Sequence, residues 1–180
     1  MSGHSASVHV LSGESGSGKT TLCVRTVSLL QRAGVQVAGI VSPARFEGGK
    51  KTGIFVQDVR TGSRRLLAEP GKGDGLGWSF DPEALRWGSD VLKTAAPCDV
   101  LVIDELGPLE LKQGKGWTAA WDVLNAHPAV AALVVVRPSL VDSLKDRLRS
   151  RDARMISTTP SLPSDEELAK LILSDIAERE

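Results

Sequence analysis

The sequence has few features of a disulfide-stabilised, metal-binding or membrane protein. Only two of its 180 residues are cysteines, Cys23 and Cys98, and they form no CxxC pair, which argues against a zinc or redox motif. The N-terminus lacks the pattern of a secretory signal, and isolated thiols in such a chain are typical of reduced cytoplasmic proteins. The longest apolar runs, such as residues 129–136, are too short to span a bilayer. We therefore predict a cytoplasmic protein with no membrane association.

An excess of charge of either sign is also missing. The 22 basic and 22 acidic residues give a formal net charge of +0, so no overall attraction draws the chain to nucleic acid, and we expect no nucleic-acid partner. The length suits one α/β domain covering residues 1–180, large enough to bury a full core. We expect a monomer or a small homo-oligomer.

Apolar segments of strand length alternate with segments of helical periodicity. The expected strands are residues 8–11, 35–41, 99–104, 129–136 and 154–157, and the expected helices are 19–33, 81–94, 117–125, 138–150 and a last one capped by Ser164 and Glu167. Several strands are apolar throughout, which is typical of a parallel sheet that is covered by helices on both faces. The predicted fold class is therefore α/β, a three-layer sandwich with a mostly parallel central sheet.

A small β-hairpin insertion is expected after the second strand. Residues 52–59 and 64–68 have strand character and flank a Thr-Gly-Ser turn, a combination typical of a hairpin. Residues 46–51 contain two adjacent glycines and are predicted to form a turn. Residues 69–78 are rich in glycine and are predicted to form a loop.

One motif carries a specific chemistry. Residues 13–20 read Gly-Glu-Ser-Gly-Ser-Gly-Lys-Thr, which satisfies GxxxxGK followed by Ser or Thr in full, with a strand before it and a helix after it. The glycines let backbone N–H groups point at phosphate oxygens, and the helix start adds a positive dipole end. The Lys19 ammonium then reaches the β- and γ-phosphates, and the Thr20 hydroxyl ligates Mg²⁺. The predicted nucleotide-binding residues are Gly13, Glu14, Ser15, Gly16, Ser17, Gly18, Lys19, Thr20 and Thr21.

A second motif supplies acidic groups. Residues 100–103 are all apolar and are followed directly by Asp104 and Glu105, so the two carboxylates emerge at the carboxyl edge of the sheet, where ligands bind in open α/β folds. Asp104 suits the role of a second Mg²⁺ ligand. Glu105 is placed to orient and deprotonate a water that faces the γ-phosphate.

Each of several other polar and aromatic residues allows more than one role. Arg137 follows a buried strand and is either a catalytic charge stabiliser or an ordinary loop charge. Glu110 either returns to the site, caps a helix or faces solvent. A group of cations near the hairpin either covers the triphosphate or is solvated, and an aromatic group either stacks on a base or belongs to the core. These two groups are Arg45, Lys50, Lys51, Arg64 and Arg65, and Trp78, Phe80 and Trp117.

The phosphate loop, residues 98–111 (CDVLVIDELGPLEL) and the segment that begins at Lys51 together resemble the THEP-type nucleoside-triphosphatase family, also known as cancer-related nucleoside-triphosphatases. Residues 104–107 are similar to the DEIG pattern of that family, with Leu for Ile, and Glu110 matches a later Glu. Glu14-Ser15 and Gly53-Ile54 depart from the family pattern. The resemblance covers the chain to about residue 150 and implies a RecA-like P-loop fold with Mg²⁺-dependent hydrolysis of ATP, GTP and other triphosphates.

The predicted function is therefore that of a magnesium-dependent nucleoside triphosphatase, with Lys19, Glu105 and Arg137 as catalytic residues and Thr20 and Asp104 as metal ligands. Two alternatives stay open. One is a kinase that passes the γ-phosphate to a nucleotide or another small molecule, and the other is a non-catalytic nucleotide-binding accessory protein.

Overall fold

The computed structural model describes residues 7–71, 77–126, 129–148, 153–157 and 163–178. Its strands are β1 (Ser7–Ser12), β2 (Val37–Val41), β3 (Ala44–Glu47), β4 (Lys50–Asp58), β5 (Arg64–Pro70), β6 (Trp78–Phe80), β7 (Val100–Leu106), β8 (Ala131–Val136) and β9 (Ala153–Ser157). Its helices are α1 (Lys19–Arg32), α2 (Pro82–Lys93), α3 (Pro108–Leu111), α4 (Ala119–Asn125), the 3₁₀ turn η1 (Pro138–Leu140), α5 (Val141–Arg147) and α6 (Asp165–Ala177).

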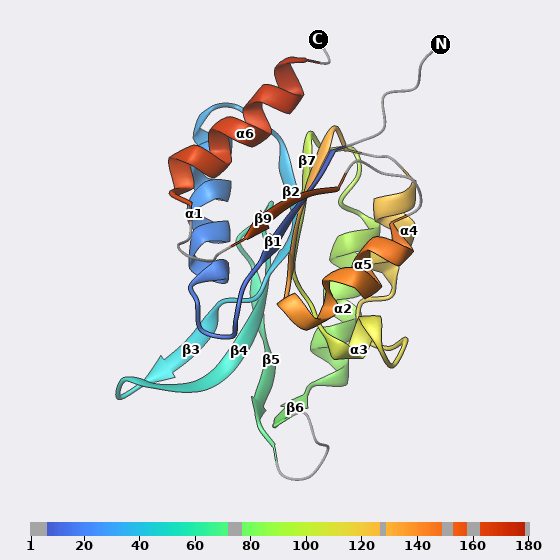
Figure 1. Cartoon of the computed structure of the whole chain (residues 1–180). Helices are drawn as coiled ribbons and strands as arrows, with labels where there is room; N and C mark the ends of the chain where they lie inside the picture. Colours follow the sequence, from blue (N-terminus) through green and yellow to red (C-terminus); the bar gives the residue numbers. More distant parts are fainter. Residues whose placement is uncertain (1–6, 72–76, 127–128, 149–152, 158–162, 179–180) are drawn as a thin grey trace.

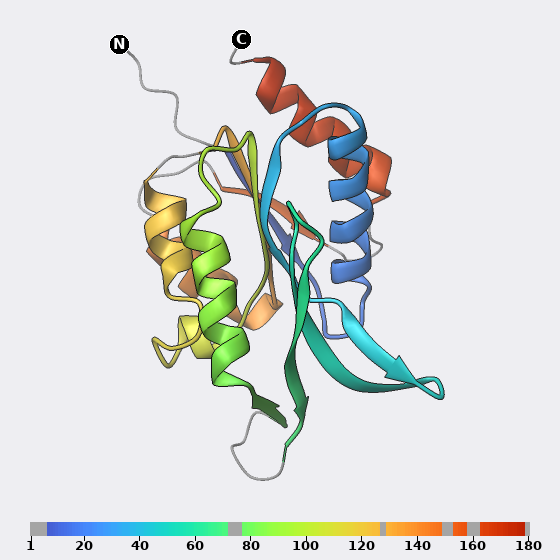
Figure 2. The ribbon, with the colours of Figure 1, turned by 180° about the vertical axis from the view of Figure 1, so that it is seen from behind.

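The described strands form one sheet in the order β6-β5-β4-β2-β7-β8-β1-β9, with β3 paired to β4. The strands from β2 to β9 in this order are parallel, and the β4–β6 side is antiparallel. Helices α1 and α6 cover one face, and α2, α3, α4 and α5 cover the other (Figures 1 and 2). The predicted three-layer α/β sandwich with a mostly parallel sheet is therefore confirmed.

The parallel strands are buried because their side chains are apolar on both faces. β8 is buried at every position, and β7 is buried at all but Glu105. The core is accordingly split into two clusters, one between the sheet and α1 with α6, the other between the sheet and the helices of the opposite face. Continuous burial of this kind is typical of a central parallel strand. The buried runs of β7 and β8 end near the polar residues Glu105 and Arg137.

Close packing of β2 against β7 depends on one glycine. Gly39 has a φ of +118°, and a Cβ at this position would fall on the carbonyl oxygen of Val102. Ile40 and Val37 on either side pair in register with Ile103 and Val100. The absence of a side chain at Gly39 therefore allows β2 to pack closely against β7, the strand that ends in the acidic pair.

The hairpin region matches its prediction in the main strands and differs at the ends. The predicted hairpin is present as β4 and β5. Residues 46–51, predicted as a turn, instead contain the end of β3 and the start of β4, and the turn narrows to Gly48 and Gly49 with φ of +55° and +76°, because two consecutive glycines are enough for a tight hairpin turn. The β3–β4 hairpin projects beyond the sheet (Figure 2).

Two further predictions need correction. The predicted loop 69–78 is wrong at both ends, since β5 continues to Pro70 and β6 begins at Trp78. These two residues pair with each other. Residues 72–76 lie outside the described residues. The predicted helix 138–150 is a 3₁₀ turn followed by α5, which ends at Arg147, and residues 149–150 again lie outside the described part. None of the helices in the described residues is long and apolar enough to cross a membrane.

Candidate active site

The phosphate loop joins β1 to α1 as the motif predicts. Gly16 and Gly18 have φ of +79° and +89°, a conformation that side chains with a Cβ rarely adopt. The Ser17 N–H donates to the Glu14 carbonyl at 3.2 Å. The Lys19 side chain is buried and its Nζ donates to the same carbonyl at 2.7 Å. The ammonium group therefore lies against the loop in which it is expected to bind phosphate.

One buried side-chain oxygen of the loop has no hydrogen-bond partner among the described residues. Ser17 Oγ is buried and makes no hydrogen bond within the part of the chain that the structure describes. Buried hydroxyls normally have a partner. A phosphate oxygen is a suitable one, since the surrounding loop is shaped to bind an anion.

The order of the strands brings the predicted polar groups to one edge of the sheet. β8 lies between β1 and β7, and parallel strands end at the same edge. The phosphate loop after β1, the acidic pair at the end of β7 and Arg137 after β8 therefore meet there. Arg137 reaches this edge because β8, the strand that it follows, lies between the loop strand and the acidic strand.

Asp104 is fully buried and contacts two other elements. Thr20 Oγ1 donates to its Oδ1 at 3.2 Å, and the backbone N–H of Ser42, just after β2, donates to its Oδ2 at 3.2 Å. The Ser42 hydroxyl also donates to the Asp104 carbonyl. Burial raises the pKa of the Asp104 carboxyl from 3.8 to about 6; the Ser42 N–H counters this shift most, and the Glu105 charge adds to it.

The surroundings of Asp104 fit a hard cation. Burial disfavours the ionised form of a carboxylate, and a nearby positive charge stabilises that form. Mg²⁺ also accepts a hydroxyl and a carboxylate as ligands, alongside phosphate oxygens and water. The described residues contain no group of three His, Cys, Asp or Glu side chains that would hold a metal alone. Thr20 and Asp104 are the residues that would hold Mg²⁺, together with the nucleotide.

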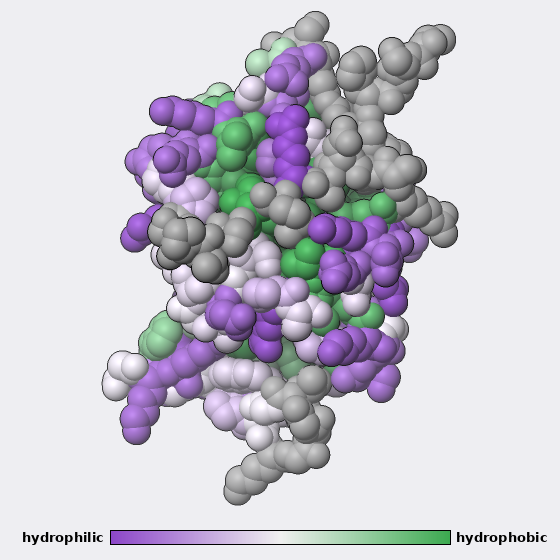
Figure 3. Space-filling view, in the orientation of Figure 1, coloured by the Kyte–Doolittle hydropathy of each residue, from purple (hydrophilic) through white to green (hydrophobic). Residues whose placement is uncertain are grey.

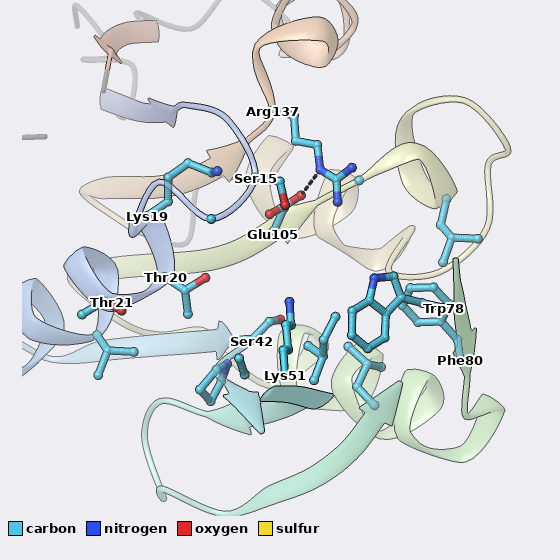
Figure 4. Close-up of a pocket in the computed structure, with 18 of the residues that line it drawn as sticks. Ser15, Lys19, Thr20, Thr21, Ser42, Lys51, Trp78, Phe80, Glu105 and Arg137 are labelled. Carbon is cyan, nitrogen blue, oxygen red and sulfur yellow. Dashed lines mark hydrogen bonds and ion pairs between the residues drawn. The ribbon is translucent and has the colours of Figure 1, made fainter. Parts of the chain in front are cut away.

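Glu105 points away from Asp104 and into the open part of the site. Its Oε1 accepts from Arg137 Nε at 3.0 Å (Figure 4). Both side chains contact solvent, with 27% of Glu105 and 45% of Arg137 exposed. The end of β7 thus carries a buried carboxylate, suited to a metal, and next to it an accessible one, suited to proton transfer.

Of the cations near the hairpin, Lys51 faces the site. Burial is the main reason that the pKa of Lys51 is lowered, and the positive charge of Arg137 adds to the effect while Glu105 and Asp104 oppose it. Its Nζ also lies 4.9 Å from the centre of the Trp78 ring. In Figure 4, Lys51 lies below Glu105 and Arg137, on the hairpin side.

The remaining hairpin cations have surface roles. Arg45 bonds Thr52 and Glu69, and Lys50 is exposed. Arg64 and Arg65 lie over the rings of Phe55 and Trp87, at 4.6 Å and 5.1 Å. None of these four lines the cavity: Lys50, Arg64 and Arg65 are exposed, and Arg45 is bonded within the hairpin region.

Glu110 caps a helix and also lines the cavity, so two of the three roles that the sequence left open hold together. Its Oε2 accepts from the Gly107 N–H at 2.9 Å and its Oε1 from the Trp117 N–H at 3.0 Å, so it closes the start of α3 and ties it to the segment before α4. Burial raises its pKa despite these bonds. The helix α3 itself was not predicted, since four residues leave no periodicity to detect. Ser42 was also missed, because its only signal is its place after a strand that neighbours the acidic one.

A cavity of about 760 Å³ joins these groups. At one end it is lined by the phosphate loop and the start of α1, and near its middle by Ser42, Lys51, Glu105 and Arg137. Trp78, Phe80 and Trp117 line the same cavity on the side away from the loop, where Figure 4 shows the first two across from Ser15 and Lys19. The aromatic group therefore lies at the site and not only in the core.

A strand, phosphate loop and helix, with an acidic strand two positions away in a parallel sheet, define a P-loop nucleotide-binding protein. A family model described as NTPase matches residues 8–162. The nucleoside-triphosphatase THEP1 of Thermofilum pendens is 33% identical over 156 residues, covering 83% of this chain and 85% of its own. That of Methanopyrus kandleri is 31% identical over 175 residues, covering 94% of each.

The chain belongs to the THEP1-type nucleoside-triphosphatase family, which confirms the resemblance and the predicted class of enzyme. Two solved structures share its fold. The solution structure of a human cancer-related nucleoside triphosphatase superposes with a TM-score of 0.66 at 23% identity, covering 97% of this chain and 98% of that one. The crystal structure of THEP1 from Aquifex aeolicus gives 0.62 at 22% identity, with 94% and 96% covered.

Proposed function

We propose that this protein hydrolyses the γ-phosphate of ATP, GTP and other nucleoside triphosphates, with Mg²⁺ bound by Thr20 and Asp104. One observation carries the proposal: at a single edge of the sheet, the phosphate loop and the accessible Glu105 line one cavity, and the buried Asp104 contacts the loop threonine, Thr20, from beneath it. The membership of the nucleoside-triphosphatase family supports the same reaction.

Binding of the triphosphate would be carried by residues 13–21. The loop amides and Ser17 Oγ would donate to phosphate oxygens, and Lys19 Nζ would exchange its bond to the Glu14 carbonyl for the β- and γ-phosphates. Bound Mg²⁺ would neutralise charge on the phosphates. Several fixed donors around a dispersed charge stabilise a phosphoryl transition state by electrostatics, with little reorganisation.

Glu105 would act as the base in hydrolysis. Its carboxylate lines the cavity beside Lys51 and Arg137, so it can accept a proton from a water that attacks the γ-phosphorus. The guanidinium of Arg137, once released from Glu105, would be free to stabilise charge that develops on the transferred group. The low polarity of the cavity wall beyond these residues would strengthen both effects.

The test is phosphate release from a panel of triphosphates, with Mg²⁺ and with EDTA, by the parent and by Glu105→Gln. We expect Mg²⁺-dependent release by the parent, and a loss of at least about 100-fold in kcat in the variant, with nucleotide affinity retained. Glu178→Gln, which removes the same charge from an exposed position after α6, is the control and should behave as the parent.

Other outcomes would point to the alternative functions. Turnover of Glu105→Gln near the parent rate would contradict the role of Glu105. Phosphate transfer that requires an added acceptor would favour a kinase, and tight binding without turnover would favour a non-catalytic nucleotide-binding protein.

A further inference from the structure

The cavity extends beyond the groups that a triphosphate requires. Its far part, here called the apolar chamber, is walled by side chains from β4, β5, β6, α2 and the segment before α4, and these are Ile54, Leu67, Trp78, Phe80, Leu85 and Trp117. None of these elements belongs to the phosphate loop. The whole cavity, about 760 Å³, lies in the size range of pockets that enclose a small organic molecule.

The aromatic rings of the chamber are available to a ligand. Trp78 and Phe80 are half-buried on β6, the edge strand of the sheet, and Figure 4 shows both rings at the side of the cavity across from the phosphate loop. The Lys51 ammonium lies over the Trp78 ring and marks the entrance to the chamber from the triphosphate side. Flat aromatic walls favour a flat apolar partner, through stacking and area burial.

Lys51, whose Nζ lies 4.9 Å from the centre of the Trp78 ring, brings a positive charge to the entrance of the chamber. Among the described residues that line the cavity, the cations are Lys19, Arg25, Lys51 and Arg137, all of which belong to the loop, α1 or the central group around Glu105. The acidic residues that line the cavity are Glu105, in that central group, and Glu110, whose two oxygens are both bonded to backbone N–H groups. An anion such as a nucleotide monophosphate would meet Lys51 at the entrance but only the six apolar side chains beyond it, and an anion buried there without a partner is strongly disfavoured.

We propose that the apolar chamber binds a small, flat, uncharged molecule bearing a hydroxyl group, and that this hydroxyl is an acceptor for the γ-phosphoryl group. This rests on the proposed Mg²⁺-nucleotide site. Glu105 lines the cavity between the loop and the chamber (Figure 4), so a hydroxyl at the chamber entrance takes the place of the hydrolytic water. The chamber thereby selects an apolar alcohol over a nucleotide as the acceptor.

The transfer is balanced without any further reactant. The acceptor oxygen forms a bond to the γ-phosphorus, and the bond between that phosphorus and the β,γ-bridging oxygen breaks, leaving the electron pair on the nucleoside diphosphate. The hydroxyl proton passes to Glu105 and then to solvent. The products are a phosphate monoester, a nucleoside diphosphate and a proton.

The test uses 2-phenylethanol, indole-3-ethanol and 2-naphthylmethanol as probes, with AMP as the anionic comparison. Binding is measured by calorimetry in the presence of Mg²⁺ and a non-hydrolysable ATP analogue, and transfer from ATP is followed by ³¹P NMR. Hydrolysis of ATP without any probe is measured in parallel, so that failure of the nucleotide site is recognised separately.

The variants are matched by chemistry. Trp78→Ala removes a chamber wall, whereas Trp87→Ala removes an equal ring that also lies under a cation, Arg65, but does not line the cavity. Trp78→Phe keeps an aromatic face and controls for folding. We expect at least one aromatic alcohol to bind with a stoichiometry of one, a loss of affinity of 10-fold or more in Trp78→Ala alone, recovery in Trp78→Phe, and a phosphate monoester signal from the alcohol.

Three results would overturn the proposal while ATP hydrolysis is intact. They are no binding of any of the three alcohols, an equal loss of binding in the Trp78 and Trp87 alanine variants, and binding without ester formation. Transfer to AMP in preference to the alcohols would overturn the assigned acceptor class.

Discussion

Arg137 Nε lies 3.0 Å from Glu105 Oε1, and both side chains line the cavity near its middle. The predicted charge stabiliser and the predicted base are therefore paired with each other, from the ends of two adjacent parallel strands. The pair is partly exposed, so it contributes little to stability and can be separated at small cost by a triphosphate. Its main effect is to hold both side chains where the γ-phosphate is expected.

Replacing Arg137 tests its catalytic role. Arg137→Ala should lower kcat for ATP hydrolysis by on the order of 10³ or more, the range found for arginines that stabilise phosphoryl transition states, and should change KM much less. Arg86→Ala, which removes an exposed guanidinium from α2, is the control for net charge. Equal kinetics of the two variants would show that Arg137 is only a loop charge.

The environment of Asp104 predicts an unusual dependence of stability on pH. Its pKa is about 6 in the folded protein against an ordinary 3.8, so the folded state binds the proton more tightly than the unfolded state between these values. In EDTA, this group should therefore make the free energy of unfolding fall as pH rises from about 4 to about 6, by up to about 3 kcal/mol.

Asp104→Asn isolates this effect, because it removes the titrating group and keeps its shape. Urea unfolding at pH 8 in EDTA should show the variant to be more stable than the parent. At pH 4 the difference should shrink. Hydrolysis should be lost in the variant, since Mg²⁺ loses its protein carboxylate. A variant less stable than the parent at pH 8 would mean that the ionised carboxylate is well compensated by Ser42, Thr20 and Lys19.

His9 predicts a pH effect of the opposite sign. It is fully buried on β1 and its Nε2 lies 2.8 Å from Asp175 Oδ2 of α6, whose other oxygen accepts from Arg154 Nη1 at 2.7 Å. Burial lowers the pKa of His9, with Asp175 opposing this shift. The unfolded state therefore binds the proton more tightly, and the free energy of unfolding should decrease as pH falls below about 6.5.

The measurement is the difference in urea unfolding free energy between parent and His9→Gln from pH 5 to pH 8. The variant should show a smaller decrease on the acid side, even if it is less stable at every pH. Because both proteins retain Asp104, its contribution cancels in the difference. A parallel pair of curves would mean that His9 does not titrate differently in the two states.

Gly39 should be among the least tolerant positions of the sheet. Gly39→Ala places a methyl group on the Val102 carbonyl at a φ of +118°, and we expect a loss of more than about 4 kcal/mol or a failure to fold. Gly34→Ala is the control, because Gly34 also has a positive φ, of +85°, but open space around it. It should cost about 1 to 2 kcal/mol, measured by urea unfolding.

Local patterns were enough to predict the strand–loop–helix unit and the acidic strand. The conformation of residues 13–20 depends on the residues of the loop itself, since glycines at positions 16 and 18 permit the positive φ angles found there. The apolar run that ends at Asp104 likewise predicts a buried strand, and it predicts that the acidic side chains follow at the end of that strand. Short elements escaped prediction, because α3 and β6 are three or four residues long and are stabilised by partners distant in the chain.

The neighbours of the predicted residues could not be read from spacing. Glu110 had three open roles, and its bonds to the Trp117 and Gly107 N–H groups, together with its place in the cavity wall, show which two of them hold. Trp78 lies in a segment that reads as a loop, and it becomes a cavity wall only because β6 pairs with β5. Contacts of this kind depend on the crossing order of strands, which periodicity does not encode.

The sequence by itself determined that the chain binds a triphosphate tail, because the phosphate loop is a contiguous motif whose backbone geometry is local. Only the tertiary structure decided what faces that tail. The insertion of β8 between β1 and β7 brings Arg137 to Glu105, and the antiparallel extension through β6 supplies the apolar chamber. The physical reason is that long-range strand pairing, and not any property of neighbouring residues, sets which side chains share a cavity.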